Sequence, residues 1–310
     1  MAQSTLGVVG LGVFGGAIAA RLVRQGFPLM VFDIANGPLQ YFVMNHQADI
    51  AFGPRMMAET CDVVITALPS MTALRETAFG PDGLALGRRP DFALVDVGRH
   101  DPLAVKSFAD DCTKRGIAFV EAAACGTPVD ARAGTLIIPV GGDDIVIERL
   151  MPVLGALGEQ VVRIGPPGSA TAAAALAGYL RAAATLALGE ALLVAERGHL
   201  SPAALLQLSR ALGAIAPAAE RAFRPREVSL SLAASHRLDV VVEDLDVVLR
   251  LATASGKAPA LAAACRTSWD EARQAMGSLE DHAAIRRWLE QNVASSSVAV
   301  AGANSNPPGA

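Results

Sequence analysis

The chain has 310 residues and a formal net charge of −4, with 26 basic against 30 acidic side chains, and the basic residues form no stripe. This charge balance argues against nucleic acid as a partner. The four cysteines lie far apart without a C-x-x-C pair, which argues against a disulfide framework or a zinc site, so we predict no metal. The length allows about two domains with a substantial core.

The start of the chain predicts a dinucleotide-binding unit. A short apolar run over 6–9 leads into the glycine turn Gly10-Leu11-Gly12-Val13-Phe14-Gly15, and a helical pattern follows over 17–24. A second apolar run over 28–32 ends at Asp33. Strand, glycine turn, helix, strand and acid in this order form the Rossmann fingerprint.

Each residue type in this unit has a physical role. Gly10 permits the tight turn, Gly12 leaves the main chain open to a pyrophosphate, and Gly15 lets helix and strand pack closely. Asp33 is placed to accept hydrogen bonds from a ribose 2′-hydroxyl and would repel a 2′-phosphate. Because no Arg or Lys lies between Asp33 and Arg55, NAD is the expected cofactor and NADP the alternative.

Strands alternate with helices as far as residue 164. Asp101 and Pro102 predict the start of a helix that reaches about residue 115. Apolar runs predict further strands over 62–69, 92–97, 117–121 and 135–140. We therefore expect an α/β fold in which residues 1–164 form a Rossmann domain with a doubly wound parallel sheet.

From residue 165 onward the pattern predicts helices only. Residues 165–294 are expected to form an all-helical substrate and dimerisation domain, followed by a disordered tail over 295–310. The predicted helices are one long apolar helix over 169–197, one that starts at Ser201, and others over 239–255, 258–275 and 281–293.

The long helix is expected to be buried in protein and not to span a membrane. Tyr179, Arg181 and Glu190 interrupt its apolar tract. Because the chain opens with the Rossmann strand itself, we expect no signal peptide and a cytoplasmic location.

Four stretches of the chain resemble the β-hydroxyacid dehydrogenases, and the resemblance covers about residues 6–293. They are the glycine turn, the strand over 62–69 with the later segment 79–84, the pair 133–136 and 140–142, and Glu243-Asp244-Leu245. The resemblance implies hydride transfer between a nicotinamide cofactor and a small carbonyl or hydroxy substrate held between two domains, and a homodimer formed through the helical domain. It also implies cofactor contacts from the loops that contain Leu68 and Pro69, and Gly98 and Arg99.

The substrate motifs of that family are altered in this chain. The segment over 121–127 matches the family's substrate loop, but Cys125 stands where the family has a serine that donates to the substrate carboxylate. Gly126 is kept and Thr127 follows it. The family's later Lys-Asp pair reads Glu243-Asp244. The resemblance implies that these five residues contact the substrate.

The family's catalytic lysine, the general acid/base at the reacting carbonyl, is missing. Counting from the glycines before the long helix, it falls at Ala174 or Ala175, and the accompanying asparagine falls at Ala177 or Gly178. A positioned acid contributes about 10²–10⁴-fold to such a reaction, and alanine supplies none of that.

Three side chains are candidates to replace the lysine, each with a structural alternative. Tyr179 could donate a proton or be a packed aromatic residue. Arg181 could stabilise an oxyanion or form a salt bridge. His100 lies in the loop expected beside the nicotinamide, and histidine is the residue type most often used as a general acid, but His100 could be a solvated loop residue.

Three functions follow from these residues. The first is an NAD-dependent oxidoreductase with an altered substrate pocket. The second is an enzyme like the imine reductases, whose cationic substrate a lysine would repel and Glu243 or Asp244 would attract. The third is an NAD-binding protein without catalytic activity.

Overall fold

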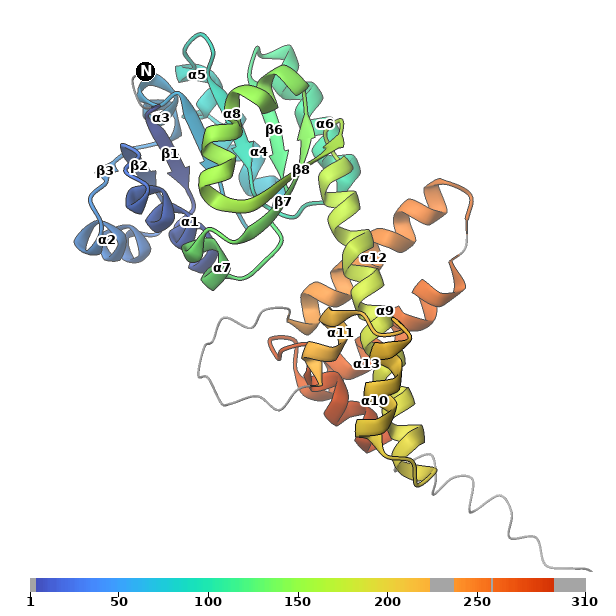
Figure 1. Ribbon diagram of the computed structural model, residues 1–310. Helices are drawn as coiled ribbons and strands as arrows, with labels where there is room; N and C mark the ends of the chain where they lie inside the picture. The colour runs from blue at the N-terminus through green and yellow to red at the C-terminus, as the bar shows by residue number, and fades with distance from the viewer. Residues whose placement is uncertain (1–3, 224–236, 258, 293–310) are drawn as a thin grey trace, which may run out of the picture. The chain divides into compact units, whose positions relative to one another are not determined.

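The computed structural model describes residues 4–223, 237–257 and 259–292. Figure 1 traces the chain from blue at the N-terminus to red. Internal contacts divide it into two compact units, Met1–Ala174 and Ala175–Ala310. The predicted disordered tail over 295–310 lies outside the described residues.

The first unit is built on one eight-stranded sheet with the strand order β3-β2-β1-β4-β5-β6-β7-β8 (Figure 1). The chain moves outward from β1 through β2 to β3 and then returns to the other side of β1 with β4. This reversal is the topological switch point at which open α/β sheets bind ligands. The strands are β1 (Leu6–Val9), β2 (Leu29–Phe32), β3 (Asp49–Ile50), β4 (Val63–Thr66), β5 (Ala93–Asp96), β6 (Ala118–Ala122), β7 (Leu136–Gly142) and β8 (Gly158–Gly165).

Helices cover both faces of this sheet because successive strand residues point to opposite faces. Val63 and Ile65 of β4 belong to a hydrophobic cluster shared with α1 (Val13–Arg24) and α8 (Asp144–Leu157). Val64 belongs to a second cluster shared with α4 (Met71–Phe79) and α6 (Pro102–Lys114). Burial on both sides explains why the central strands are continuous apolar runs. The unit also contains α2 (Asn36–Asn45), α3 (Pro54–Thr60), α5 (Leu84–Gly87) and α7 (Pro128–Ala133).

The Rossmann sheet expected from the sequence is confirmed, but it contains two strands that were not predicted, and one strand runs in the opposite direction to its neighbour. β3 and β8 were not predicted, because β3 has only two residues and β8 is mostly exposed and therefore not an apolar run. β7 runs antiparallel to β6, so the sheet is not wholly parallel. The connection between them contains only the six-residue helix α7, which rises about 9 Å and is too short to return the chain along the sheet.

The second unit is helical, as predicted. α9 (Ser169–Arg197) begins in the first unit and continues through the second. By length and composition alone α9 could also cross a membrane. The core of the unit surrounds Trp269, which is fully buried and donates its Nε1–H to the carbonyl oxygen of Ala182 on α9 at 3.3 Å. The other helices are α10 (Pro202–Ala211), α11 (Pro217–Ala222), α12 (Leu238–Ala254), α13 (Ala260–Met276) and one over 284–292.

α12 begins one residue before the predicted start. Arg237 occupies its N-cap, so Asp239 lies in the first turn. Asp239 forms an ion pair with Arg237. The last described helix begins at residue 284, three residues after its predicted start.

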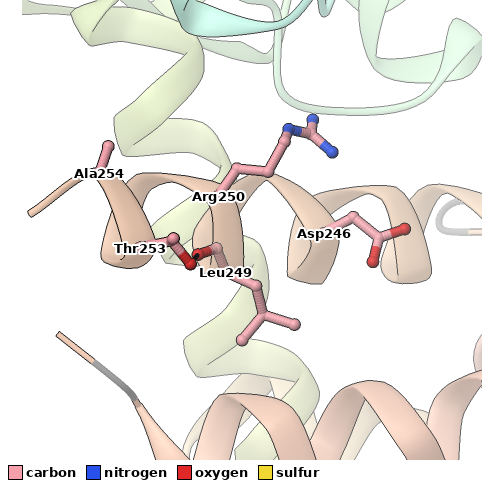
Figure 2. Close-up of a pocket in the computed structure, with 5 residues that line it drawn as sticks. All are labelled: Asp246, Leu249, Arg250, Thr253 and Ala254. Atoms are coloured by element: carbon pink, nitrogen blue, oxygen red, sulfur yellow. Dashed lines mark hydrogen bonds between the residues drawn. The ribbon is translucent and has the colours of Figure 1, made fainter. Parts of the chain in front are cut away.

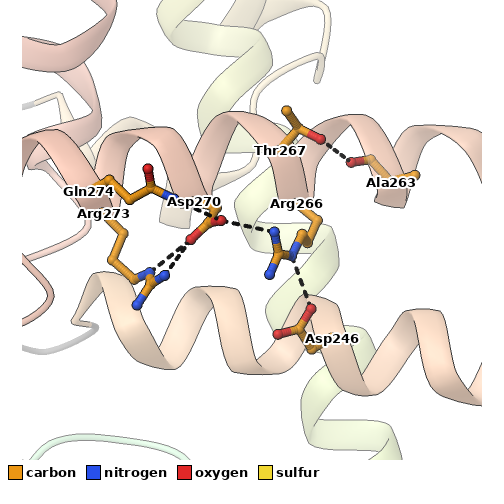
Figure 3. A network of polar contacts seen from close by, with 7 residues as sticks. All are labelled: Asp246, Ala263, Arg266, Thr267, Asp270, Arg273 and Gln274. Atoms are coloured by element: carbon orange, nitrogen blue, oxygen red, sulfur yellow. Dashed lines mark hydrogen bonds and ion pairs between the residues drawn. The ribbon is translucent and has the colours of Figure 1, made fainter.

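An ion network joins α12 to α13 (Figure 3). Arg266 donates to Asp246 on α12 at 3.0 Å and to Asp270 on its own helix at 2.9 Å. Arg273 donates twice to Asp270, and these bonds, with burial acting in the opposite direction, hold the pKa of the Asp270 carboxyl below its usual value. The Arg266–Asp246 pair therefore links the two helices.

Candidate functional site

The turn between β1 and α1 requires glycine at two positions for steric reasons. Gly10 has φ +92°, and a Cβ there would lie 2.5 Å from the carbonyl oxygen of Ala67. A Cβ on Gly15 would lie 1.9 Å from the carbonyl oxygen of Gly10. Gly10 therefore lets the turn approach the chain that follows β4, and Gly15 lets α1 pack against the turn.

Gly12 differs, because the space where its Cβ would point is open: no described atom lies within 4 Å. Gly12 is also the N-cap of α1 and offers no capping side chain. The first turn of α1 therefore presents main-chain N–H groups and the positive end of the helix dipole to open space. This arrangement fits a pyrophosphate.

Asp33 follows β2 and shapes the same turn. Its Oδ2 accepts the N–H of Leu11 at 2.7 Å and its Oδ1 accepts the N–H of Ala35 at 2.8 Å. Each carboxylate oxygen has a further lone pair, so the acid can also accept from a ribose hydroxyl. In the glycine turn, Val13 is 71% exposed, and Phe14 packs against the hydrophobic cluster around α1.

The other predicted cofactor contacts lie in the loops that leave β4, which pairs with β1, and β5, which pairs with β4. Leu68 is half-buried and Pro69 is exposed after β4. Gly98 is half-buried and Arg99 is exposed after β5. The structure therefore brings the predicted cofactor residues to the same, carboxyl-terminal edge of the sheet.

A buried polar cluster lies at that edge. The parallel register places Thr66 of β4 beside Asp96 of β5, and the Thr66 hydroxyl donates to Asp96 Oδ1 at 2.7 Å. His100 Nε2 lies 3.3 Å from Asp96 Oδ2. His100 is only 8% exposed, so its interpretation as a solvated loop residue is wrong.

The ring of His100 folds back over the β5 loop. A Cβ on Gly98 would lie 2.5 Å from His100 Nε2, so glycine is required there for the ring to reach Asp96. Although Nε2 is close to Asp96, the two atoms lack hydrogen-bond alignment, and Nε2 has no other partner among the described residues. Sequence reasoning missed Thr66 and Asp96; a carboxylate inside the apolar run over 92–97 was the available signal.

The predicted substrate loop follows β6. Cys125 pairs with Ile137 of β7 through main-chain hydrogen bonds of 2.9 and 3.1 Å, and its thiol contacts the carbonyl oxygen of Ala123. Gly126 has φ +146°, a conformation that favours glycine. The Thr127 hydroxyl accepts two N–H groups at the start of α7 and forms a capping box with Asp130, so this side chain serves the helix.

The two possible positions of the missing lysine have different surroundings. Ala174 packs with Ala170 and Ala123, and Cys125 of the substrate loop packs against this cluster. Ala175 packs in the helical unit with residues of α12 and α13. Of the two, only Ala174 contacts the substrate loop.

The predicted site residues of the second unit differ in how far their side chains are buried. Tyr179 packs against both hydrophobic clusters of the helical unit, and Arg181 is half-buried. Glu243 is exposed, whereas Asp244 is buried beneath Gly178 of α9, where a Cβ would lie 2.1 Å from the carboxylate. A helix-packing role for Tyr179 and Asp244 accounts for these contacts.

Figure 2 shows a hollow over the later part of α12, where Arg250 and Leu249 leave the helix on opposite sides. Its lining residues all come from this one helix: Asp246, Leu249, Arg250, Thr253 and Ala254. Small-molecule sites are enclosed by several elements, so this hollow is not a convincing binding site. No group of three or more potential metal ligands occurs in the described part of the chain.

Two family models match the chain. Residues 5–165 match the NAD-binding domain of 6-phosphogluconate dehydrogenase, and residues 168–289 match the NAD-binding domain of NADP-dependent 3-hydroxyisobutyrate dehydrogenase. The chain is 26% identical over 289 residues to 3-sulfolactaldehyde reductase of Escherichia coli (strain K12), covering 93% of this chain and 96% of the relative.

Solved structures share the fold. A Mycobacterium tuberculosis 3-hydroxyisobutyrate dehydrogenase structure with L-serine has a TM-score of 0.82 and 22% identity, covering 93% of this chain and 99% of that one. An imine reductase from Myxococcus stipitatus with NAD+ has a TM-score of 0.57 and 17% identity, covering 93% and 99%. Since the first family model alone accounts for half of the sequence, the chain belongs to the β-hydroxyacid dehydrogenase family of NAD(P)-dependent oxidoreductases.

Proposed function

We propose that this protein reduces a small aldehyde, or oxidises the corresponding alcohol, with NAD as the hydride carrier. The observation that carries the proposal is the turn at Gly10, Gly12 and Gly15, open at Gly12 and tied to Asp33. A nicotinamide cofactor supplies or accepts the hydride when bound. Asp33 favours NAD, because a carboxylate next to the ribose repels a 2′-phosphate.

The substrate that we propose carries an anionic group near the reacting carbon. The name of the Escherichia coli relative specifies an aldehyde that also bears a sulfonate, and the Mycobacterium tuberculosis structure contains L-serine, a small hydroxy acid. In this chain the main-chain N–H of Gly126 is a candidate donor to such a group, because the next N–H, that of Thr127, is donated to Asp130 at 2.8 Å.

His100 is the proton donor that we propose in place of the missing lysine. Hydride addition to a carbonyl carbon leaves negative charge on oxygen, and one proton must reach that oxygen. Asp96, 3.3 Å from Nε2, would attract the protonated ring electrostatically, which leaves Nδ1 to exchange the proton. Compared with Tyr179, which packs in the helical core, His100 lies at the sheet edge where the cofactor residues gather.

Substitutions test the donor and the cofactor site separately. His100→Asn should lower kcat by about 10²–10⁴-fold with an unchanged dissociation constant for NADH. Tyr179→Phe should keep kcat near the parent value. If Tyr179→Phe abolished turnover and His100→Asn did not, the donor assignment would be wrong and the oxidoreductase assignment would stand. Absence of binding to both NADH and NADPH, followed by nicotinamide fluorescence, would exclude the whole proposal.

Reduction of a C=N bond is the second candidate, favoured by alanine at both possible lysine positions, 174 and 175, and by the exposed carboxylate of Glu243. An iminium substrate is already cationic, so it needs no lysine and is attracted by carboxylates. Turnover of cyclic imines with none of hydroxy acids or aldehydes would select this candidate. Cofactor binding without turnover of either class would select the non-catalytic alternative.

We also propose that the helical unit forms a homodimer. α10 buries none of its residues, and its Leu208 is 56% exposed, with Leu212 just beyond the helix 72% exposed. Apolar side chains exposed together on one helix are typical of subunit contacts. Light scattering should give twice the monomer mass, and Leu208→Glu with Leu212→Glu should give a folded monomer. A monomer mass for the parent protein would contradict the dimer. A dimer mass for the double variant would mean that the interface lies elsewhere.

A further inference from the structure

A buried carboxylate joins the substrate loop to the start of the long helix. Glu121 lies on β6 and is only 1% exposed. Its Oε2 accepts the N–H groups of Gly168 at 2.8 Å and Ala170 at 3.1 Å, and its Oε1 accepts the N–H of Thr171 at 2.9 Å. Oε1 also accepts the Thr171 hydroxyl. Four donors of one helical turn therefore converge on one side chain.

The position of this cap along the chain is unusual. The first turn of a helix has main-chain N–H groups without helical partners, and a nearby Ser, Thr, Asp or Asn normally accepts from them. Here the acceptor is 47 to 50 residues earlier in the chain. Ser169, in the same turn, has a buried hydroxyl oxygen with no hydrogen-bond partner in the described part of the chain. The distant carboxylate replaces a local cap.

Because the Glu121 carboxylate is buried, it needs several hydrogen-bond donors in place of water. A buried carboxylate is strongly disfavoured unless hydrogen bonds replace its hydration, and the positive end of a 29-residue helix adds to their effect. Glu121 can meet that requirement only where the N–H groups of 168–171 converge. The start of α9 is therefore held at one register against β6.

The same turn determines the surroundings of the substrate loop. Ala170 and Ala174, on the first turns of α9, pack against Ala123, two residues after Glu121, and Cys125 packs against the same cluster. The loop is therefore held to α9 at Glu121 and again at Ala123. A shift of α9 along β6 would move the main chain that leads to Gly126.

We propose that Glu121 is a positioning residue for substrate, acting through the register of α9 against the substrate loop. Among the described residues, no hydrogen bond joins Glu121 to the cofactor turn, whose contacts come from Asp33 after β2 and Ala67 after β4. Because Glu121 already occupies the N–H groups at the start of α9, the anionic group of the substrate is bound elsewhere. The role of Glu121 in substrate binding rests on the proposed function. Its role in holding the register of α9 rests only on the hydrogen bonds.

The test compares Glu121→Gln, Glu121→Asp and the exposed control Glu159→Gln. Glutamine has nearly the same shape as glutamate. However, its NH2 group is a hydrogen-bond donor and would face the N–H donors of the helix where a carboxylate oxygen now accepts from them. We expect Glu121→Gln to raise KM for the substrate by about tenfold or more, in line with loss of hydrogen bonds to a charged group. KM for NADH should change less than about twofold. Glu121→Asp should recover part of the loss, and Glu159→Gln should match the parent protein.

Hydrogen exchange separates this proposal from the catalytic assignment, because it requires no substrate. In Glu121→Gln the amides of Gly168, Ala170 and Thr171 should exchange about tenfold faster or more, and those at the start of α1 should not change. If Glu121→Gln fails to fold, Thr171→Val removes a single donor and should produce smaller changes in the same direction, with Thr171→Ser restoring the parent behaviour. Unchanged exchange at these amides, or equal rises in KM for NADH and substrate, would overturn the proposal.

Discussion

Asp33 binds the main chain of Leu11: its Oδ2 accepts the Leu11 N–H at 2.7 Å, across 22 residues of sequence. Its other oxygen accepts the N–H of Ala35 at 2.8 Å. The acid that the fingerprint assigns to the ribose therefore also fixes the second residue of the glycine turn. Cofactor selectivity and turn geometry depend on one side chain.

Asp33→Asn should raise the dissociation constant of NADH by about tenfold, because the amide accepts through one oxygen only and loses its charge. NADPH should weaken less, since the repulsion of its 2′-phosphate is removed. The ratio of the two dissociation constants, from fluorescence titrations, is the quantity to compare. Asp49→Asn, an exposed neighbour on β3, is the matched control and should leave the ratio unchanged. A ratio that stays at the parent value in Asp33→Asn would contradict the role of the charge.

Gly12 and Gly15 should respond in opposite ways to the same small substitution. Gly12→Ala adds a methyl group to open space, so we expect an unchanged melting temperature and weaker NADH binding. Gly15→Ala places a methyl group 1.9 Å from the carbonyl oxygen of Gly10, so we expect a loss of about 1–3 kcal/mol in the free energy of unfolding. Thermal unfolding and NADH titration of both variants check this. Normal cofactor binding by Gly12→Ala would argue that the pyrophosphate does not approach this residue.

The sequence predicted those features whose signals are local. Glycine spacing and apolar runs of four to eight residues identified β1, β2, β4 to β7 and the cofactor turn, because strands buried on both faces contain few polar residues. β8 has mainly exposed residues and gave no such signal. The direction of β7 depends on the length of the preceding helix, which no pattern within β7 specifies.

The polar contacts of the candidate site could not be read from the sequence. Thr66 meets Asp96 because β4 and β5 are adjacent and paired in that register, and His100 then reaches the same carboxylate. Glu121 accepts from donors about fifty residues later. Such contacts depend on strand order and on helix placement, so they become visible only when the fold is known. The absence of the family's lysine, in contrast, could be read from the sequence, because it requires only the identity of the residues at positions 174 and 175.

Gly178 should be required for the packing of α9 against α12. A Cβ there would lie 2.1 Å from Asp244 Oδ2, and the Asp244 side chain is buried. Gly178→Ala should therefore reduce the free energy of unfolding by about 1–3 kcal/mol through overpacking. Gly155→Ala on α8 is the control: apart from its chain neighbours and the nearby backbone of its own helix, no described atom lies within 4 Å of its Cβ position, and a helical alanine should stabilise by about 0.5–1 kcal/mol. Denaturant unfolding gives the free energy of unfolding of both variants. If Gly178→Ala were stabilised as much as Gly155→Ala, the close contact with Asp244 would be refuted.

The cysteines should differ in reactivity toward iodoacetamide. Burial is the main factor that raises the pKa of Cys61 and of Cys112 to about 12 in each case. The thiolate is the reactive form, so at pH 8 only about one in 10⁴ of these groups is reactive. Cys125 is half-buried and should be alkylated first. Mass spectrometry of the native protein should find Cys125 modified while Cys61 and Cys112 react only after denaturation; early modification of Cys112 would show that the core around α6 opens.

The α12–α13 ion network should lose its contribution to stability in acid. Hydrogen bonds from Arg273 lower the pKa of Asp270 in the folded protein, so the carboxylate stabilises the fold above its unfolded pKa of about 3.9. This contribution is lost as the pH falls through the lower, folded-state pKa. Asp270→Asn should therefore unfold more easily than the parent at pH 7, by roughly 0.2–1 kcal/mol for each ion pair lost, and the difference should shrink toward pH 3. Glu271→Gln, an exposed position on the same helix, should show no such convergence. A difference in unfolding free energy that persists unchanged at pH 3 would mean that Asp270 acts through packing and not through its charge.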